Sequence, residues 1–299
     1  MRVIIYGHKG WIGKKFVEIL KSNNIDYILG TARVDNDIEL RREITVSCAS
    51  NVIAFIGRTH GPGYNTIDYL EQPGKLFDNV RDNMYAPLNL AIICESLNVH
   101  YTYIGTGCIF TYDENHTLNE GLQGLQGLQG FTESDIPNFT GSSYSIVKGF
   151  TDRIMHHYKN VLNLRIRMPI TSVDEPRNFI SKIIRYSKIC SVPNSMTVLD
   201  DMLPVMLDMM RKNITGTFNM TNPGLISHNE ILELYCKLVD NNFTWTNFDE
   251  EEQNKILDSK RSNNYLDTSK LTQHYPDIPH IKDSVKIIME KWNKKVCNY

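Results

Sequence analysis

The chain has 299 residues, of which 41% are hydrophobic and 22% are charged, and its formal net charge at pH 7 is −2. This balance, without a dense run of Lys or Arg, argues against nucleic acid as the main partner, and no apolar run approaches the roughly 18 residues of a membrane span. Six scattered cysteines without CxxC spacing or a Cys/His cluster indicate neither a disulfide framework nor a metal site. We therefore expect a cytoplasmic, globular protein with one large core or two modest domains.

A glycine-rich turn near the N-terminus connects an apolar strand to a helix. The apolar run 3–6 precedes Gly7, Gly10 and Gly13, and an amphipathic helix is expected from about Ile12 to Lys21. Gly7 permits a tight turn, Gly10 lets a pyrophosphate approach the backbone, and Gly13 lets the helix pack close to the strand. Glycines also occur in ordinary turns, but the strand-turn-helix context favours a dinucleotide at the helix N-terminus. The predicted cofactor-binding residues of this turn are Gly7, His8, Lys9, Gly10, Trp11, Ile12 and Gly13.

The residue beyond the second expected strand indicates which dinucleotide binds. Tyr27 to Thr31 has the pattern of that strand, and the position after it normally meets the adenosine ribose. An acidic residue there would accept hydrogen bonds from a free 2′-hydroxyl, whereas a basic residue accommodates a 2′-phosphate. The chain carries Arg33 at this point and Lys9 in the glycine turn, which favours NADP(H) over NAD(H). The alternative is that both are solvated surface bases.

Strands and helices continue to alternate as far as about residue 168. The expected elements are a buried strand at 51–56, a Gly/Pro-rich loop at 57–65, a helix at about 75–98 interrupted by Pro87, a strand at 101–105, a helix at 144–158 and a strand at 162–167. This alternation predicts a doubly wound parallel sheet of the Rossmann type, with the ligand crevice at the carboxyl ends of the strands.

The pattern changes in the C-terminal third. Helices are expected at 178–186 and 203–211, and Ser227 and Glu230 have capping-box spacing before another helix. We therefore expect an NADP-binding domain at 1–168 and a smaller, mixed substrate-binding lobe at 169–299, a division that allows the chain to cross back to the sheet. The three-residue repeat at 121–130 is too rich in glycine for a helix and is expected to be a loop insertion over the site.

Tyr144 and Lys148 are the expected catalytic pair. Four residues apart, they lie on one face of a helix. Tyrosine, with an ordinary pKa of about 10, becomes an acid or base near neutral pH when a cation stabilises its phenolate. Lys148 can supply that cation and is also a predicted cofactor-binding residue that holds the nicotinamide ribose. Such pairs are also common on exposed helix faces, but here the pair follows the glycine turn and the strand-terminal Thr106. The set predicts a ketone reductase, with Asn83 as a fourth member.

Cys108 lies two residues beyond Thr106, where an extended chain would turn it to the same side. On spacing alone, a small buried hydrophobic role is favoured. The residues 7–13 and 106–109 together resemble the GDP-fucose synthases, and this resemblance implies that Cys108 is an acid/base that epimerises a 4-keto sugar before reduction.

A longer resemblance, over nearly the whole chain, is to the nucleotide-rhamnose epimerase/reductases of the extended short-chain dehydrogenase/reductase superfamily. The strings that carry it are Thr106-Gly-Cys-Ile-Phe110, Pro137-Asn-Phe-Thr-Gly-Ser142 before Tyr144, Arg165-Ile-Arg-Met-Pro-Ile170, Pro176-Arg-Asn-Phe-Ile180, Asn222-Pro-Gly224, Ser227-His-Asn-Glu-Ile-Leu232 and Arg261-Ser-Asn-Asn264. The chain departs from the family's pattern in the 121–130 repeat and in the loop that follows Phe55-Ile56-Gly57.

The resemblance implies a substrate and roles for further residues. The substrate is UDP-4-keto-6-deoxy-glucose, or its dTDP form, and the product is the L-rhamnose nucleotide. Lys182 is implied as the acid on the sugar face opposite Cys108, although an exposed helix lysine is an equal alternative. By position, Thr140, Asn178 and Arg261 are expected to bind the substrate.

Three questions stay open from the sequence. The rival functions are a 4-ketoreductase without epimerase activity and a non-catalytic NADP-binding subunit on the same fold. The choice between UDP and dTDP is not determined. A homodimer through the helices near 75–98 and 144–158 is the superfamily's habit, and we expect it here on that ground.

Overall fold

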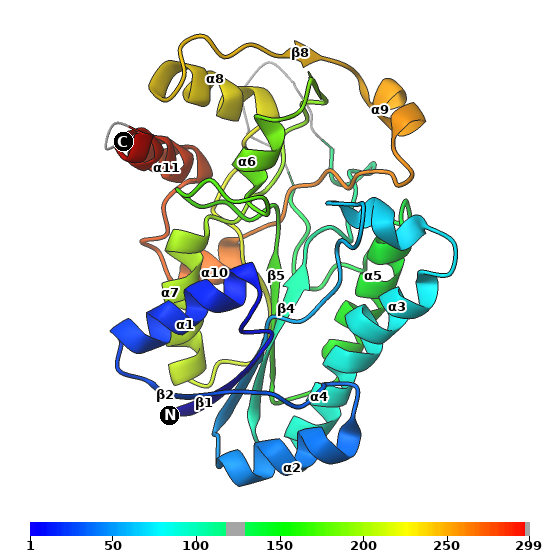
Figure 1. The fold of residues 1–299 in the computed structure, drawn as a ribbon, viewed down its shortest axis with the longest axis vertical. Helices are drawn as coiled ribbons and strands as arrows, with labels where there is room; N and C mark the ends of the chain where they lie inside the picture. Colours follow the sequence, from blue (N-terminus) through cyan, green and yellow to red (C-terminus); the bar gives the residue numbers. More distant parts are fainter. Residues whose placement is uncertain (118–128, 297–299) are drawn as a thin grey trace.

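The computed structural model describes residues 1–117 and 129–296. In these residues the central layer is a six-stranded parallel sheet in the order β2-β1-β3-β4-β5-β7 (Figure 1). The strands are β1 (Arg2–Tyr6), β2 (Asp26–Leu29), β3 (Asn51–Ala54), β4 (His100–Thr106), β5 (Val161–Ile166) and β7 (Gly216–Asn219). The order reverses between β1 and β3, which is where an open parallel sheet forms its ligand crevice. The expected doubly wound sheet is confirmed.

Helices cover both faces of the sheet (Figure 1). One face packs on α1 (Trp11–Ser22), α7 (Leu199–Arg211) and α10 (Ser269–His274), and the other on α2 (Asp37–Ser47), α4 (Ala86–Ser96) and α5 (Ser143–Met155). The short helix α3 (Leu76–Val80) lies on the same side and packs against α5. Apolar strand residues such as Ile4 and Ile5 are fully buried on opposite faces. This is why the strand sequences are continuously apolar and do not alternate with polar residues.

The helix expected at 75–98 forms with a local change before Pro87. A π-helical turn, η2 (Arg81–Tyr85), joins α3 to α4, and Pro87 lies in the first turn of α4. Proline lacks the N–H that an α-helical hydrogen bond needs, and a wider turn before it accommodates this loss. The expected interruption at Pro87 is therefore a π turn within one helical rod.

The C-terminal lobe has its own core above the sheet (Figure 1). Its elements are α6 (Phe179–Ile183), β6 (Lys188–Ile189), α8 (His228–Leu238), β8 (Thr246–Asn247), α9 (Glu250–Ile256) and α11 (Ile281–Val296). Ser227 and Glu230 form the expected capping box at the start of α8. Residues 199–219 lie beyond the proposed boundary at 168, yet they supply α7 and β7 to the sheet layer. The chain thus crosses back before it completes the lobe.

Residues 118–128, which hold most of the three-residue repeat, lie outside the described residues, so the loop expected there stays a prediction. Over the described part of the chain, every helix is too short or too polar to cross a membrane.

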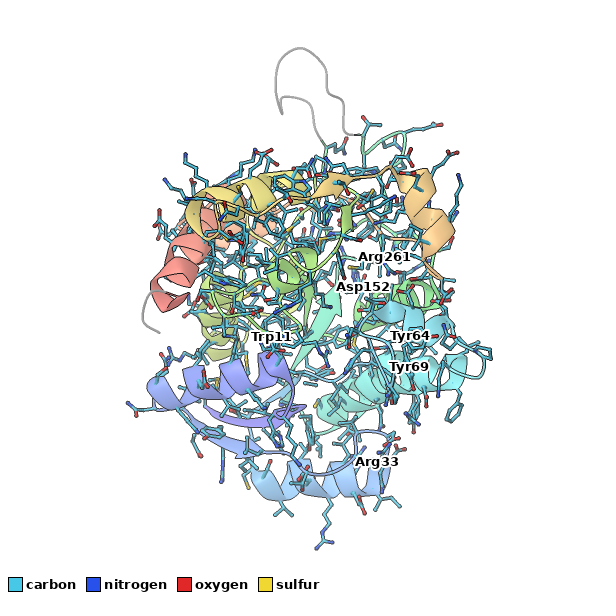
Figure 2. The ribbon with its side chains drawn as sticks, turned by 45° about the horizontal axis from the view of Figure 1, so that its top comes forward. Trp11, Arg33, Tyr64, Tyr69, Asp152 and Arg261 are labelled. Carbon is cyan, nitrogen blue, oxygen red and sulfur yellow. The ribbon has the colours of Figure 1, made fainter. Side chains whose placement is uncertain are left out.

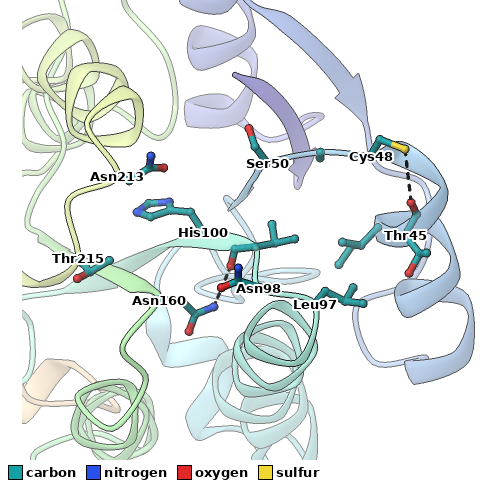
Figure 3. Close-up of a pocket in the computed structure, with 12 residues that line it drawn as sticks. Thr45, Cys48, Ser50, Leu97, Asn98, His100, Asn160, Asn213 and Thr215 are labelled. Carbon is teal, nitrogen blue, oxygen red and sulfur yellow. Dashed lines mark hydrogen bonds between the residues drawn. The ribbon is translucent and has the colours of Figure 1, made fainter.

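A cavity of about 690 Å³ lies at the amino ends of the strands (Figure 3). Its lining includes Cys48 at the end of α2, His100 at the start of β4, and Asn160. Asn160 donates to the carbonyl of Val99 at 2.8 Å and so holds the rim together. The cavity is lined by apolar and neutral polar residues, without an Asp, Glu, Lys or Arg side chain. It lies at the opposite end of the sheet from the carboxyl ends of the strands, where a doubly wound sheet binds its ligands.

Candidate active site

The glycine turn after β1 has the backbone that its sequence predicts. Gly7 has a φ of +74°, and a Cβ atom there would lie 2.5 Å from the carbonyl oxygen of Phe55. A Cβ atom on Gly13 would lie 2.4 Å from the carbonyl oxygen of Gly7. Both positions therefore exclude a side chain. The amide of Gly10 closes the turn on the Gly7 carbonyl at 3.0 Å, and α1 begins at the next residue.

The other residues of the turn differ in exposure. Lys9 is exposed, whereas His8 is half-buried and its Nδ1 atom has no hydrogen-bond partner in the structure. Trp11 and Ile12 pack partly on the core between the sheet and α1. In Figure 2, Trp11 lies at the start of α1, across the molecule from Tyr64 and Tyr69.

Arg33 lies on the rim of a cavity beside the glycine turn. The cavity measures about 340 Å³, and its lining includes Gly7, Arg33 and Gly57. The guanidinium of Arg33 makes two hydrogen bonds to Asp35, at 2.9 and 2.7 Å, and 70% of the side chain is exposed. The hydrogen bond and charge of Asp35 raise the pKa of Arg33. The structure thus places a permanently charged cation at the end of β2, beside the cavity.

Thr106, Cys108 and Tyr144 come together at the carboxyl end of β4. Thr106 is the last residue of the strand, and its hydroxyl accepts a hydrogen bond from the Cys108 amide at 3.1 Å. The ring of Tyr144 is buried with Tyr69 and Leu70, and the Cys108 side chain packs against this cluster. Burial and the charge of Cys108 raise the pKa of Tyr144, while a hydrogen bond with Thr106 opposes them.

Tyr144 and Cys108 also line a third cavity, of about 200 Å³, between the sheet and the C-terminal lobe. Apolar side chains such as Phe179 and Tyr186 form one side of it, and Lys260 and Arg261 contribute cations. A phenol and a thiol thus face one cavity, and the Thr106 hydroxyl lies beside them through its hydrogen bond to the Cys108 amide. This combination can bind a carbonyl oxygen and exchange protons with the neighbouring carbons.

Lys148 lies one helical turn after Tyr144 and is buried. Its ammonium donates a hydrogen bond to the hydroxyl of Tyr103 and lies 3.5 Å from the carbonyl oxygen of Ile104. Burial lowers the pKa of Lys148 to about 8, although the Asp152 carboxylate raises it. The Asp152 carboxylate is itself bound by Arg165 at 2.7 Å. The charge of Asp152 therefore acts on Lys148 through space, without a hydrogen bond between the two side chains.

Arg167 is a residue of the site that no pattern in the sequence singles out. Its guanidinium is fully buried, and one nitrogen lies 3.7 Å from the Cys108 sulfur. The other hydrogen-bond partners are neutral oxygens, among them those of Asn194 at 2.5 Å and Ser262 at 3.0 Å. Burial lowers the pKa of Arg167 and the Cys108 charge raises it. The structure thus places a buried guanidinium beside the Cys108 sulfur, on the segment that follows β5.

Lys182 belongs to a group of cations on α6, on the segment before it and on the loop after β3, and it does not line the cavity that holds Cys108 and Tyr144. It lies on α6, and burial and the charges of Arg177 and Arg261 lower its pKa. Arg177, just before α6, donates to the Nε2 atom of His60 on the loop after β3. Burial lowers the pKa of His60, as do Arg177, Arg58 and Lys182. Positive charge concentrated here suits an anionic ligand.

Arg261 is anchored to the opposite wall of the crevice. Its guanidinium binds the Asp68 carboxylate at 2.6 Å, in the short helix η1 (Ile67–Glu71), and donates to the Ser259 hydroxyl. Burial favours the neutral form of Asp68, but the hydrogen bonds from Arg261, Thr66 and Ser259 outweigh it and lower its pKa to about 2. Figure 2 shows Arg261 above Tyr69, at the border of the C-terminal lobe.

The structure leaves three of the expected site residues apart from this group. The amide of Asn83 donates to the Arg58 carbonyl and accepts from the Arg58 amide, both at 2.9 Å, and so holds the loop after β3. Asn178 is fully buried, donates to the Thr171 carbonyl at 2.7 Å and caps α6. Thr140 is exposed. The side-chain amides of Asn83 and Asn178 thus form hydrogen bonds with backbone groups.

Comparisons with known proteins agree with this arrangement. No protein-family model matches the chain. The uncharacterized protein L780 of Acanthamoeba polyphaga mimivirus is 54% identical over 292 residues, which cover 97% of this chain and 98% of that protein. A bifunctional dTDP-4-dehydrorhamnose 3,5-epimerase/dTDP-4-dehydrorhamnose reductase of Arabidopsis thaliana is 42% identical over 294 residues, 98% of this chain and 93% of its own. The chain belongs to the nucleotide-rhamnose epimerase/reductase family.

Solved structures place this epimerase/reductase chain within a wider fold group. The crystal structure of the L780 UDP-rhamnose synthase from the same virus superimposes with a TM-score of 0.92 at 53% identity, covering 97% of this chain and 99% of that one. A dTDP-4-dehydrorhamnose reductase from Clostridium acetobutylicum superimposes with a TM-score of 0.77 at 18% identity, covering 97% and 99%. The second likeness shows the shared fold alone.

Proposed function

We propose that the chain converts a UDP- or dTDP-linked 4-keto-6-deoxy-glucose into the L-rhamnose nucleotide by inverting C3 and C5 and then reducing the C4 ketone. The observation that carries the proposal is the Cys108 thiol, which lies beside Thr106 and Tyr144 with the Arg167 guanidinium 3.7 Å from its sulfur. A plain ketoreductase needs the hydroxyl and the phenol. An epimerase also needs a base beside the ketone, and the thiol supplies it.

The epimerisation uses the acidity that the C4 ketone gives to its neighbours. The Cys108 thiolate takes a proton from C3, and the electron pair moves to the C4 oxygen as an enolate. Thr106 and Tyr144 hydrogen-bond this oxygen and stabilise its charge. Arg167 balances the negative charge on the sulfur before the proton is taken. Cys108 then loses the proton it took to solvent and the proton donor on the other face regains one, after which the same base acts on C5.

Inversion needs a proton from the other face of the sugar, and we propose that Lys182 donates it. The lysine approaches from α6, on the lobe side of the crevice, whereas Cys108 follows β4 on the sheet side. Burial and two neighbouring guanidinium groups lower its pKa, which makes its ammonium a stronger acid than that of a surface lysine.

Reduction of the inverted ketone completes the reaction. A nicotinamide bound at the glycine turn would supply a hydride to C4, and Tyr144 delivers a proton to the C4 oxygen. Lys148 lies one turn away with its ammonium at the carboxyl edge of the sheet, where its charge favours the phenolate that Tyr144 leaves behind. Proton return to the phenolate readies the enzyme for the next substrate.

The residues present fit a dinucleotide, and we propose that it is NADP(H). The glycine turn leaves no room for a Cβ atom at Gly7 or Gly13, which gives the tight turn and the close packing of α1 on the strand that a dinucleotide site requires. Arg33, at the rim of the adjoining cavity, would face a 2′-phosphate, and Asp35 holds the Arg33 guanidinium in place. His8, Lys9 and Trp11 would lie over the phosphates.

Arg261 is the best supported of the three expected substrate contacts, because it lines the cavity that holds Cys108 and Tyr144. We propose that it and Arg177 bind the diphosphate of the nucleotide sugar. Asn178 would act indirectly, by fixing the segment that carries Arg177 and Lys182. Thr140 stays a predicted contact of the exposed rim.

We also propose that the protein is a homodimer. Large apolar side chains remain exposed along α3, α4 and α5, and the most exposed are Leu76, Phe77, Ile92 and Phe150. A row of this kind on neighbouring helices favours a partner surface. The two helical regions are those through which the resemblance to the superfamily implies a dimer.

Proton NMR in deuterium oxide tests the function. The 4-keto-6-deoxy sugar nucleotide is incubated with the protein, first without NADPH and then with it. Deuterium entering C3 and C5 before NADPH is added, followed by an L-rhamno product, is the expected result. Reduction without exchange would leave a 4-ketoreductase, and neither event would leave a binding protein. The UDP and dTDP forms are compared in parallel.

A further inference from the structure

Tyr103 is a buried tyrosine in the middle of the sheet whose hydroxyl meets the catalytic lysine. It lies on β4, three residues before Thr106, and only 1% of its surface is exposed. The ammonium of Lys148 donates a hydrogen bond to its hydroxyl and lies 4.5 Å from the centre of its ring. The tyrosine thus offers an oxygen and an aromatic face to one cation.

We propose that Tyr103 is a positioning residue that holds the Lys148 ammonium at the carboxyl edge of β4 and keeps it charged for the reaction. The inference rests on the proposed reduction, in which Lys148 assists Tyr144. Tyr103 itself contacts neither the sugar nor the nicotinamide in this role. It acts through the lysine.

Asp152 is the other side chain that could stabilise the Lys148 ammonium, but its carboxylate is already hydrogen-bonded to other residues. The Asp152 carboxylate lies one turn beyond Lys148 on α5, but it accepts hydrogen bonds from Arg165 at 2.7 and 3.0 Å and from Asn163 at 2.8 Å. Within the described part of the chain, the Tyr103 hydroxyl is the one side-chain group hydrogen-bonded to the lysine. Removing it would leave a buried ammonium with a single backbone carbonyl.

The charges around Lys148 come from three elements. Asp152 on α5 and Cys108 after β4 both favour the ammonium, and Arg165 on β5 forms an ion pair with the Asp152 carboxylate. Tyr103 stays neutral, because burial raises its pKa well above the ordinary value. Tyr103 therefore stays uncharged and acts through the dipole of its hydroxyl, while Lys148 is the group whose charge changes with pH.

The matched control lies two residues away on the same strand. Tyr101 is also fully buried, and its ring lies 6.5 Å from that of Tyr103. Its hydroxyl has no hydrogen-bond partner in the structure. Tyr103→Phe and Tyr101→Phe therefore remove the same atom from the same face of the sheet, and only the first removes a contact with Lys148.

The test begins with the free protein, labelled with ¹³C at the lysine Cε position. The Lys148 signal is identified by its loss in Lys148→Met and followed with pH. A hydrogen bond to a charged group favours that form, so Tyr103→Phe is expected to lower the pKa of Lys148 by about one unit. Tyr101→Phe is expected to leave it unchanged. An equal pKa in both variants would overturn the proposal.

Two further readouts separate this proposal from the proposed function. We expect Tyr103→Phe to weaken NADPH binding about threefold to tenfold by fluorescence titration, and to move the alkaline limb of ketone reduction down by about one pH unit. If the wild-type protein does not reduce the 4-keto sugar, the function fails while the NMR and NADPH titrations still decide on Tyr103. Reduction with an unmoved alkaline limb would overturn Tyr103 alone.

Discussion

Cys108 and Tyr144 share one cavity but serve different steps of the proposed reaction. The thiol takes protons from carbon, and the phenol gives a proton to oxygen. Because the two steps use different atoms, substitutions at the two residues should separate them. Arg167 belongs with the first step, since its guanidinium meets the sulfur and has no carboxylate among its hydrogen-bond partners in the described residues.

Cys108→Ala should slow deuterium exchange at C3 and C5 by about 100-fold or more, because a positioned base contributes at least that much. NADPH affinity should stay as in the wild type. Exchange is followed by proton NMR and affinity by fluorescence. Cys236→Ala, on α8 and outside the cavity, is the control for loss of a thiol. Exchange at the wild-type rate in Cys108→Ala would show that another base is at work.

At the scale of elements, the turn between β1 and α1 depends on backbone that excludes side chains. Gly7→Ala combines a positive φ with a 2.5 Å approach to the Phe55 carbonyl. Gly63 has a φ of +80°, and a Cβ atom added there would have nothing within 4 Å, so Gly63→Ala measures the cost of φ alone. We expect about 1 kcal/mol of destabilisation for Gly63→Ala and at least about 3 kcal/mol for Gly7→Ala.

Urea unfolding measures the free energy of unfolding of both variants. NADPH titration should detect binding to Gly63→Ala but not to Gly7→Ala. Equal destabilisation in the two variants would mean that the turn at Gly7 relaxes away from β3.

A second element-scale contact joins η1 to the segment after α9 through the Asp68–Arg261 ion pair. The pKa of Asp68 is about 2, below its ordinary value of 3.8, so the ionised carboxylate is more stable in the folded than in the unfolded chain. This contribution is present above about pH 4 and is lost as the pH falls toward about 2. Asp68→Asn should therefore lower the free energy of unfolding by about 2 kcal/mol at pH 7.

The pH dependence distinguishes this ion pair from a general effect of the substitution. The difference between Asp68→Asn and the wild type should narrow as urea unfolding is repeated from about pH 5 to about pH 3. Asp174→Asn removes the carboxylate of a half-exposed pair with Arg185 and should change the stability little at any pH. A loss at Asp68 that does not depend on pH would argue against the pair.

At the scale of the whole molecule, the exposed apolar side chains of α3, α4 and α5 predict the assembly. Phe77 is 72% exposed and Phe150 58%. Phe77→Asp together with Phe150→Asp should convert a dimer to a monomer in light scattering, while NADPH binding persists. Ile38→Asp, on α2 and 83% exposed, is the control for a charge placed at an exposed apolar site. A wild-type monomer would contradict the proposed dimer.

Much of the sheet could be predicted from local pattern. The strands and helices around the glycine turn form where the periodicity of residues 3–21 and 51–56 indicates, because buried parallel strands and amphipathic helices have distinct apolar patterns. Ser227 and Glu230 form their capping box because its contacts lie within one helical turn. The helix expected at 178–186 is shorter, Phe179–Ile183, since its end depends on the packing of the lobe.

The sequence by itself determined what depends on near neighbours: the strand-turn-helix at Gly7, the placing of Tyr144 and Lys148 on one helix face, and the family resemblance that names Cys108 and Lys182. Only the tertiary structure decided which distant groups meet. Arg167 reaches Cys108 across 59 residues, Tyr103 reaches Lys148 across 45, and Asp68 reaches Arg261 across 193. The tertiary structure also showed that the side-chain amides of Asn83 and Asn178 form hydrogen bonds with backbone groups. The reason is physical: periodicity and capping act over a few residues, whereas the partner of a buried charge is chosen by the packing of the whole chain.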